Sequence, residues 1–398
     1  MNVTLKLKLS CSTDSSIVLK DTIKQFTDSY NRASLFGYNN KTANAVEIQK
    51  SNYYNERSLT QLPSQLVIAS FAKASESLRS RYALQKKYNA KVLKSPEKYK
   101  PKTFNCPNSY RQAVRYDAKR AGTVNLKEGW ATLASTNGRQ LVNFTLPKNF
   151  NKYEHWKVCC SELILDNKNR LMLHVILEGD GKPFVPNGYV AGVDLGIKRP
   201  AVVSNVNGSL NVFLGEKEWS SIDRRKRNYI KILQSKGTKS AKRQLKKLSG
   251  KVNRFRNNCD HVLSKQLVNS VPAGATLVFE NLKDIRERCG RGKGRIQNGR
   301  MHKWSFARLF EFVEYKARLA GIQIVKVDPR NTSRKCSKCG HVNKKNRQGQ
   351  SHFKCKSCGH KLNADLNGAR NIAQKFAVND MSLTDGCSQS TQSRQKFE

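Results

Sequence analysis

Four cysteines in the C-terminal quarter of the chain have the spacing of a metal site. Cys336 and Cys339 form one Cys-x-x-Cys pair, and Cys355 and Cys358 form a second pair after fifteen intervening residues. Two such turns present four thiolates to one tetrahedral ion, which is how proteins hold structural zinc. Because four sulfurs leave no coordination position open, we predict a structural Zn²⁺ rather than a catalytic one. Two disulfides are the weaker alternative.

Asp194 and Glu280 are acidic residues at the ends of apolar segments. Asp194 lies in VAGVDLG and Glu280 lies in TLVFENL, and both segments have the composition of buried strands. Neighbouring strands that end at the same edge of one sheet would bring the two carboxylates together. Taken singly, each residue also has an ordinary structural explanation, because Asp194 could lie in a turn and Glu280 could cap the next segment.

Asp365 begins the last helical pattern of the chain. Ala369, Ile372 and Phe376 follow it at i+4, i+7 and i+11 and predict an apolar helix face that packs on the sheet. Asp365 would then point toward the strand ends from a helix N-terminus, which favours negative charge. A helix cap is the alternative, and Asn363 is an equally good capping residue. Three acids that meet there could hold two divalent ions about 4 Å apart, the arrangement that hydrolyses phosphodiester bonds.

The segments that must position these residues alternate between strand and helix patterns. YVAGVDLG, PAVVSNV and SLNVFLG predict three strands, and Asn207-Gly208 between the last two indicates a tight hairpin. There follow a basic helical region to about Asn269, the apolar strand ATLVFENL, a helix that ends at Gly321, and the strand IQIVKV. This order predicts a mixed α/β sheet, with the cysteine module inserted before the last helix.

The N-terminal half carries fewer residues with an evident chemical role. The opening segment MNVTLKLKLS alternates apolar and polar residues, as a half-buried strand does, and about residues 20–88 have helical periodicity. From about Gln140 the pattern returns to strands, including a hairpin folded at residues 166–169. We therefore expect a helical lobe inserted into a small β-barrel-like domain.

The charge of the chain indicates a polyanionic partner. Lys and Arg number 74 against 29 Asp and Glu, which gives a formal net charge of +45 on 398 residues and favours nucleic acid. Residues 221–258 hold fourteen Lys and Arg and one acidic residue, and a Gly-rich basic stretch spans residues 286–304. A solvated helix face is the ordinary alternative for such a charge run. The candidate phosphate-binding residues are Arg224, Arg225, Arg227, Lys242, Arg243, Lys246, Lys247, Arg254, Arg256, Arg291, Lys293 and Arg295.

Composition also limits the class of protein. Hydrophobic residues make up 38% of the chain, enough to bury the cores of two or three domains, unlike a basic tail or a small ribosomal protein. The N-terminus lacks the apolar core of a signal peptide, and no apolar run reaches transmembrane length. The cysteines outside the two pairs are scattered without a disulfide-like pattern. We therefore expect a cytoplasmic protein with no membrane partner.

Taken in order, five motifs resemble those of one known family. They are GVDLGIKRPAVVS, LVFENLKDI, KVDPRNTSRKCSKCG, FKCKSCG and NADLNGARNIA, and they span about Tyr189 to Ala377. They resemble the RuvC-type nuclease domain of TnpB proteins, which are transposon-encoded RNA-guided endonucleases, and of the related miniature type V CRISPR effectors. The resemblance implies an RNase H-like fold in which Asp194, Glu280 and Asp365 bind two catalytic Mg²⁺ ions. Since all three acids are present, we expect an active nuclease.

The resemblance also implies partners and a division into domains. It implies a guide RNA made from the transposon end, and a double-stranded DNA target that carries a short adjacent motif and is cut by one nuclease site. A monomer is favoured. The expected domains are a β domain at 1–15 and 120–187, a helical recognition lobe at 16–119, a nuclease domain at 188–330 and 362–378, a zinc ribbon that binds target nucleic acid at 331–361, and a disordered tail at 379–398.

Three alternatives to this function remain open at the level of sequence. The first is the same chemistry with a guide that comes from a CRISPR array. The second is an RNA-guided DNA-binding repressor without cleavage, which the intact acids disfavour. The third is a transposase in the strand-transfer sense, because an RNase H-like fold could also support that reaction.

Overall fold

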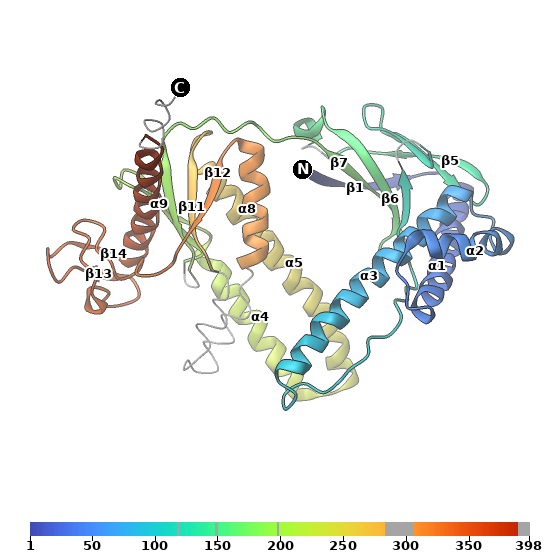
Figure 1. Cartoon of the computed structure of the whole chain (residues 1–398), viewed down its shortest axis with the longest axis horizontal. Helices are drawn as coiled ribbons and strands as arrows, with labels where there is room; N and C mark the ends of the chain where they lie inside the picture. Colours follow the sequence, from blue (N-terminus) through green and yellow to red (C-terminus); the bar gives the residue numbers. More distant parts are fainter. Residues whose placement is uncertain (118–119, 148–149, 197–198, 283–305, 389–398) are drawn as a thin grey trace, which may run out of the picture. The chain divides into compact units, whose positions relative to one another are not determined.

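The computed structural model describes residues 1–117, 120–147, 150–196, 199–282 and 306–388. Within it the chain forms two compact units, Met1–Asp180 and Gly181–Glu398 (Figure 1). The strand and helix patterns of the two halves of the sequence correspond to these two units.

The first unit is built on a seven-stranded sheet that nearly closes into a barrel. The strand order is β2-β6-β7-β1-β5-β4-β3, and all pairs are antiparallel. The edge strands β2 and β3 are consecutive in the chain, and the Tyr116 hydroxyl of β2 donates to the Ala134 carbonyl of β4 at 3.0 Å. The strands are β1 (Asn2–Ser10), β2 (Val114–Asp117), β3 (Gly122–Asn125), β4 (Trp130–Ser135), β5 (Gly138–Phe144), β6 (Lys157–Leu165) and β7 (Leu171–Glu178), with a short 3-10 helix η1 (Phe150–Tyr153) before β6.

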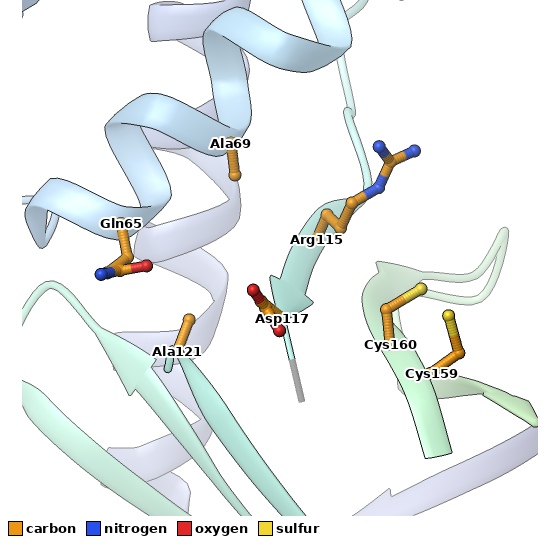
Figure 2. A pocket seen from close by; sticks show the side chains of 7 residues that line it. All are labelled: Gln65, Ala69, Arg115, Asp117, Ala121, Cys159 and Cys160. Carbon is orange, nitrogen blue, oxygen red and sulfur yellow. The ribbon is translucent and has the colours of Figure 1, made fainter. Parts of the chain in front are cut away.

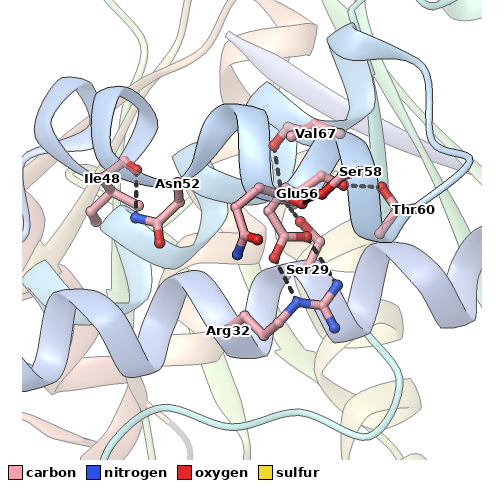
Figure 3. A network of polar contacts seen from close by, with 10 residues as sticks. Ser29, Arg32, Ile48, Asn52, Glu56, Ser58, Thr60 and Val67 are labelled. Atoms are coloured by element: carbon pink, nitrogen blue, oxygen red, sulfur yellow. Dashed lines mark hydrogen bonds and ion pairs between the residues drawn. The ribbon is translucent and has the colours of Figure 1, made fainter.

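Three helices complete this unit: α1 (Thr13–Asn39) and α3 (Ser64–Lys94) pack on the sheet, and α2 (Ala45–Leu59) packs against both of them. Leu5, Leu7 and Leu9 of β1 share one core with the buried apolar residues of α1 and α3, as the alternation in MNVTLKLKLS predicts. Between α1 and α2, the buried Glu56 accepts two hydrogen bonds from Arg32, at 2.5 and 2.9 Å (Figure 3).

The second unit contains a five-stranded mixed sheet with the RNase H-like order β10-β9-β8-β11-β12. The first three strands in the chain pair antiparallel, whereas β11 pairs parallel with both β8 and β12. The mixed sheet expected from the sequence is therefore confirmed. The strands are β8 (Val190–Asp194), β9 (Ala201–Asn205), β10 (Asn211–Leu214), β11 (Thr276–Glu280) and β12 (Gln323–Val327).

Helices cover the two faces of this sheet. Ala191, Val193 and Phe279 face one core, which they share with α5 (Lys239–Asn269) and α8 (Phe306–Ala320). The alternate residues face α9 (Ala364–Ser388), which lies on the other side of the strands (Figure 1). The helix α4 (Lys217–Lys236) packs beside α5.

The contact between β8 and α9 is unusually close because glycine occupies β8 at Gly192. A Cβ atom there would lie 2.0 Å from the Ala369 carbonyl oxygen, so any larger residue would push the helix away from the strand. Asp194 lies two residues further along β8 and therefore points to the same side of the sheet as Gly192, the side that α9 covers.

The cysteine module lies between β12 and α9. It contains a short 3-10 helix, η2 (Lys344–Asn346), and the two-stranded sheet of β13 (His352–Lys354) and β14 (Lys361–Asn363). The α9 helix runs to Ser388, so the first part of the expected tail is helical, and residues 389–398 lie outside the described residues. Among the helices of the described chain, none is long and apolar enough to cross a membrane.

Candidate active site and metal centre

Asp194 stands at the C-terminal end of β8, on the side of the sheet that α9 covers. The residue as a whole is partly exposed, but its carboxyl lies against α9, with Oδ2 2.8 Å from where a Cβ at Gly368 would stand. The pKa of Asp194 is raised to about 8. Burial is the largest cause, and the negative charges of Glu280 and Asp365 add to it. The charges of Glu280 and Asp365 therefore reach the carboxyl group of Asp194.

Glu280 reaches the same edge from the neighbouring strand. β11 runs parallel to β8, and the pairing of Phe279 with Val193 puts Glu280 level with Asp194 on the α9 side. Burial raises the pKa of Glu280, and a hydrogen bond from the Thr332 hydroxyl to Oε1, at 2.5 Å, opposes that rise. Thr332 is itself 3% exposed, so it fixes the orientation of the carboxylate.

Asp365 lies in the first turn of α9, where the sequence left two roles open. Asn363 accepts from the backbone N–H groups of Asp365 and Leu366, at 3.0 and 3.4 Å, and therefore caps the helix. Since Asn363 caps the helix, the carboxylate of Asp365 is not needed as a cap and can take part in the candidate site. It binds Nη2 of Arg347 at 3.2 Å, and the Asp365 side chain is 15% exposed.

Three residues around the acids were missed by the sequence analysis. Arg347 comes from the cysteine module, Thr332 from the loop that precedes it, and Gly368 from the first turns of α9. The glycine in NADLNGARN was the only one of the three with a visible signal, because glycine inside a helix usually marks a close approach. Arg347 and Thr332 are ordinary residues of a basic segment, and only the fold brings them to the carboxylates.

The carboxylate set has the chemistry of a site for hard divalent cations. Aspartate and glutamate oxygens are the protein ligands that Mg²⁺ prefers, and a cation would relieve the repulsion that raises the pKa of Asp194. In the described part of the chain, the four cysteines are the only group of three or more metal-binding side chains whose ligand atoms all lie within 4.8 Å of one another. The three acids are therefore more widely spread than the ligands of a single ion. That spread is compatible with two ions that share them.

The four cysteines form the compact cluster that their spacing predicts. Cys336 Sγ lies 3.8 Å from Cys358 Sγ, and Cys339 Sγ lies 3.5 Å from Cys355 Sγ. Tetrahedral coordination with Zn–S bonds of about 2.3 Å puts sulfurs about 3.8 Å apart, so the geometry is zinc-ribbon-like. Burial raises the pKa of Cys336 to about 12, whereas backbone N–H groups that point at Cys355 Sγ outweigh burial there and lower its pKa to about 6.

Two buried asparagines fasten the cysteine module to α9. The side-chain amide of Asn367 donates to the Lys335 carbonyl at 2.8 Å and accepts from the Ser337 N–H at 3.0 Å. Asn371 donates to the carbonyls of Thr332 and Lys335, both at 2.7 Å. Because α9 also carries Asp365, these bonds fix the module relative to the carboxylate site.

The basic residues proposed for phosphate contact fall into three groups. Arg227 and Arg256 both bind Asp223, at 3.0 and 2.7 Å; the first pair lies within α4, and the second joins α5 to α4. Arg291, Lys293 and Arg295 lie outside the described residues. The remaining seven are exposed on α4 and α5, and none of them makes an ion pair within the described chain: Arg224, Arg225, Lys242, Arg243, Lys246, Lys247 and Arg254.

Two protein families match the chain over regions that contain this site. The family described as "Probable transposase" (OrfB_IS605) matches residues 174–286, and the family "Cas12f1-like, TNB domain" matches residues 306–372. The first match includes β8 and β11 with their acids. The second includes β12, the cysteine module and the start of α9.

The chain is also similar in sequence to individual proteins whose names describe nucleases. The chain is 31% identical over 233 residues to the CRISPR-associated endodeoxyribonuclease Cas12f1 of Sulfoacidibacillus thermotolerans, a match that covers 55% of this chain and 53% of that protein. It is 25% identical over 300 residues to the putative RNA-guided DNA endonuclease InsQ of Escherichia coli K12, covering 69% and 67%. The chain thus spans about half the length of the first of these relatives.

Solved structures share the fold. The structure of a Cas12f1–sgRNA–target DNA complex superposes with a TM-score of 0.59 at 16% identity, over 94% of this chain and 98% of that one. The mixed sheet, its strand-end acids and the inserted four-cysteine module define an RNase H-like protein with a zinc-ribbon-like module. Together with the family matches and the named relatives, these features support a similarity of the chain to the TnpB family.

Proposed function

We propose that the chain is an RNA-guided DNA endonuclease of the TnpB type. It would bind a guide RNA made from a transposon end and cleave double-stranded DNA beside a short target-adjacent motif. The observation that carries this proposal is the environment of Asp194 at the end of β8, where burial and the charges of Glu280 and Asp365 raise its pKa to about 8. A carboxylate cluster of this kind costs stability unless it binds cations.

In this proposal Asp194, Glu280 and Asp365 hold two Mg²⁺ ions. When bound, the two ions would activate water and neutralise charge on the leaving oxygen. Thr332 keeps Oε1 of Glu280 in place through its 2.5 Å hydrogen bond. Arg347, which now binds Asp365, supplies a guanidinium at the edge of the site, where it could turn to a phosphate of the DNA.

The other parts of the chain would handle the nucleic acids. We propose that the seven exposed cations of α4 and α5 contact phosphates, because they have no acidic partners within the described residues. The helices and barrel of the first unit would bind the guide and recognise the motif beside the target. The cysteine module would hold Zn²⁺ and guide the target strand to the acids, to which Arg347 already connects it.

The direct test is cleavage by the purified RNA–protein complex. A plasmid matched to the guide should be cut when Mg²⁺ is present, and Asp194→Ala should still bind RNA but lose cleavage by 1,000-fold or more, on the order of 4 kcal/mol in transition-state stabilisation. Asp328→Ala is the matched control, since Asp328 also follows a strand of this sheet but is 56% exposed. Cleavage by Asp194→Ala at the control rate would refute the assignment of the site.

The zinc assignment can be tested separately. Metal analysis of the purified protein should find about one tightly bound Zn²⁺ per chain, which Cys355→Ser should abolish and Cys259→Ser, at a partly buried single cysteine, should leave unchanged. Zinc removal should disorder the module and stop cleavage even with added Mg²⁺. A zinc-free protein that is folded and active would contradict the assignment.

The same cleavage assay separates the alternatives. A guide from a CRISPR array gives identical chemistry, so sequencing the RNA that co-purifies with the protein is required to identify the source of the guide. A repressor would bind the matched plasmid without cutting it. A strand transferase would join transposon-end DNA to the target, whereas we expect hydrolysed ends only.

A further inference from the structure

Two adjacent cysteines on β6 lie on the same side of the strand. Successive residues of a regular strand point to opposite faces, which would separate Cys159 from Cys160. The pairing of β6 with β7 shifts between Val158 and Cys160, so Cys159 is the extra residue of a β-bulge. Figure 2 shows both side chains at the same cavity, with their sulfur atoms turned toward each other.

The cavity beside the two thiols has a volume of about 220 Å³. Its other walls are Gln65 and Ala69 of α3, Arg115 and Asp117 of β2, and Ala121 (Figure 2). The cavity is not an anion site, because the guanidinium of Arg115 is already bound by Glu76 at 2.7 Å and Glu162 at 3.4 Å. The thiols are therefore its most reactive groups.

We propose that Cys159 and Cys160 form a dithiol site for a thiophilic metalloid in its trivalent state, separate from the zinc-ribbon-like module. Two neighbouring thiols are sufficient for such a centre. Four-coordinate zinc is disfavoured here, because within the described residues neither cysteine belongs to a group of three metal-binding side chains whose ligand atoms all lie within 4.8 Å of one another. This inference does not depend on the proposed nuclease function.

The reaction can be written with a monosubstituted arsenical. R–As=O reacts with the two thiols to give R–As(S–Cys159)(S–Cys160) and one water. Two As–S bonds form, the As=O bond is lost, and its oxygen leaves with the two thiol protons. No electrons are transferred, so no oxidant or reductant is required. Burial raises the pKa of Cys160, so this group enters the reaction as a thiol whose proton leaves in the water.

The test uses the zinc-loaded full-length protein and phenylarsine oxide, followed by native mass spectrometry. We expect one adduct per chain, with loss of one water and no loss of zinc. Cys159→Ser and Cys160→Ser should each weaken binding about 100-fold, because the second sulfur acts at a high effective concentration. Cys11→Ser and Cys106→Ser are the matched controls, since both are partly buried single cysteines of the same unit, and they should bind as the wild type does.

The outcomes are decisive in either direction. No adduct with the wild type, an adduct of equal affinity in Cys159→Ser, or release of zinc in proportion to the arsenical bound would overturn the proposal. Cys159 is exposed, so serine there should leave the fold intact, which the thermal transition of the variant can verify. If Cys160→Ser fails to fold, Cys159→Ser alone gives the answer.

Discussion

Glu56 and Asp194 are acidic residues with opposite surroundings. Glu56, in the first unit, is 2% exposed, and Arg32 neutralises it with two hydrogen bonds of 2.5 and 2.9 Å. Asp194, in the second unit, faces Glu280 and Asp365, and the one arginine that lowers its pKa, Arg347, is already bound to Asp365. Glu56 therefore has a counter-ion of its own, whereas Asp194 has only Arg347, which it shares with Asp365.

This difference separates a structural acid from a candidate catalytic acid. A neutralised carboxylate ties α1 to α2 and has no capacity left for another ligand. A cluster of carboxylates with too few cations is costly for the fold and gains most when a metal binds. The same contrast divides the basic residues, because Arg256 binds Asp223 whereas Arg254 is exposed.

The largest effect on stability is expected at the paired acid. Glu56→Gln should lower the free energy of unfolding by roughly 1–2 kcal/mol, because the Glu56 carboxylate is buried but Arg32 is 42% exposed, so that water partly replaces the lost partner of the arginine. Denaturant unfolding measures the change. The double variant Arg32→Met with Glu56→Met should recover much of the loss, and Mg²⁺ should stabilise Glu56→Gln as much as the wild type. A single variant as stable as the wild type would show that the pair does not hold the helices.

Replacing Asp194 should stabilise the metal-free protein, in contrast to replacing Glu56, and the effect should depend on pH. The pKa of Asp194 is raised to about 8, so between about pH 4 and pH 8 the folded protein keeps a proton that the unfolded chain has lost. The stability of the metal-free protein should therefore fall as pH rises through this window. Asp194→Asn should flatten this fall and stabilise the metal-free protein near pH 8, by roughly 1 kcal/mol.

The measurement for Asp194 is a series of thermal unfolding curves from pH 5 to pH 9, with and without Mg²⁺. Mg²⁺ should raise the stability of the wild type most at high pH, where the carboxylates are ionised, and should raise that of Asp194→Asn much less. An unchanged pH profile in Asp194→Asn would mean that another group causes the fall.

The smallest effect is expected among the basic residues of α5. Arg254→Gln should make the salt dependence of RNA binding shallower by about one phosphate contact, a change of roughly 0.7–0.9 in the slope of log K against log salt. Arg256→Gln, at the position that binds Asp223, should instead lower stability and change the slope less. Equal slopes for both variants and the wild type would remove α5 from the proposed RNA-binding surface.

Local sequence patterns were sufficient for most elements of the second unit. The Cys-x-x-Cys spacing, the Asn207-Gly208 hairpin and the apolar run that ends at Glu280 correspond to the cysteine cluster, the β9–β10 turn and β11. The periodicity after Asp365 likewise predicted the face of α9 that packs on the sheet. Strands β2, β3 and β4 of the first unit were not predicted, and β2 lies within the range 16–119 expected for the helical lobe, because these strands are short and form only through their pairing in the sheet.

The sequence by itself determined which residues carry the chemistry: three acids at strand or helix ends, four cysteines at metal spacing, and a large excess of basic charge. Only the tertiary structure decided which neighbours they have. The contact of Arg347 with Asp365, the hydrogen bond of Thr332 to Glu280, and the close packing of α9 on Gly192 join segments that are separate in the chain. Periodicity and spacing report on residues that are near in sequence, whereas these contacts depend on how whole elements pack.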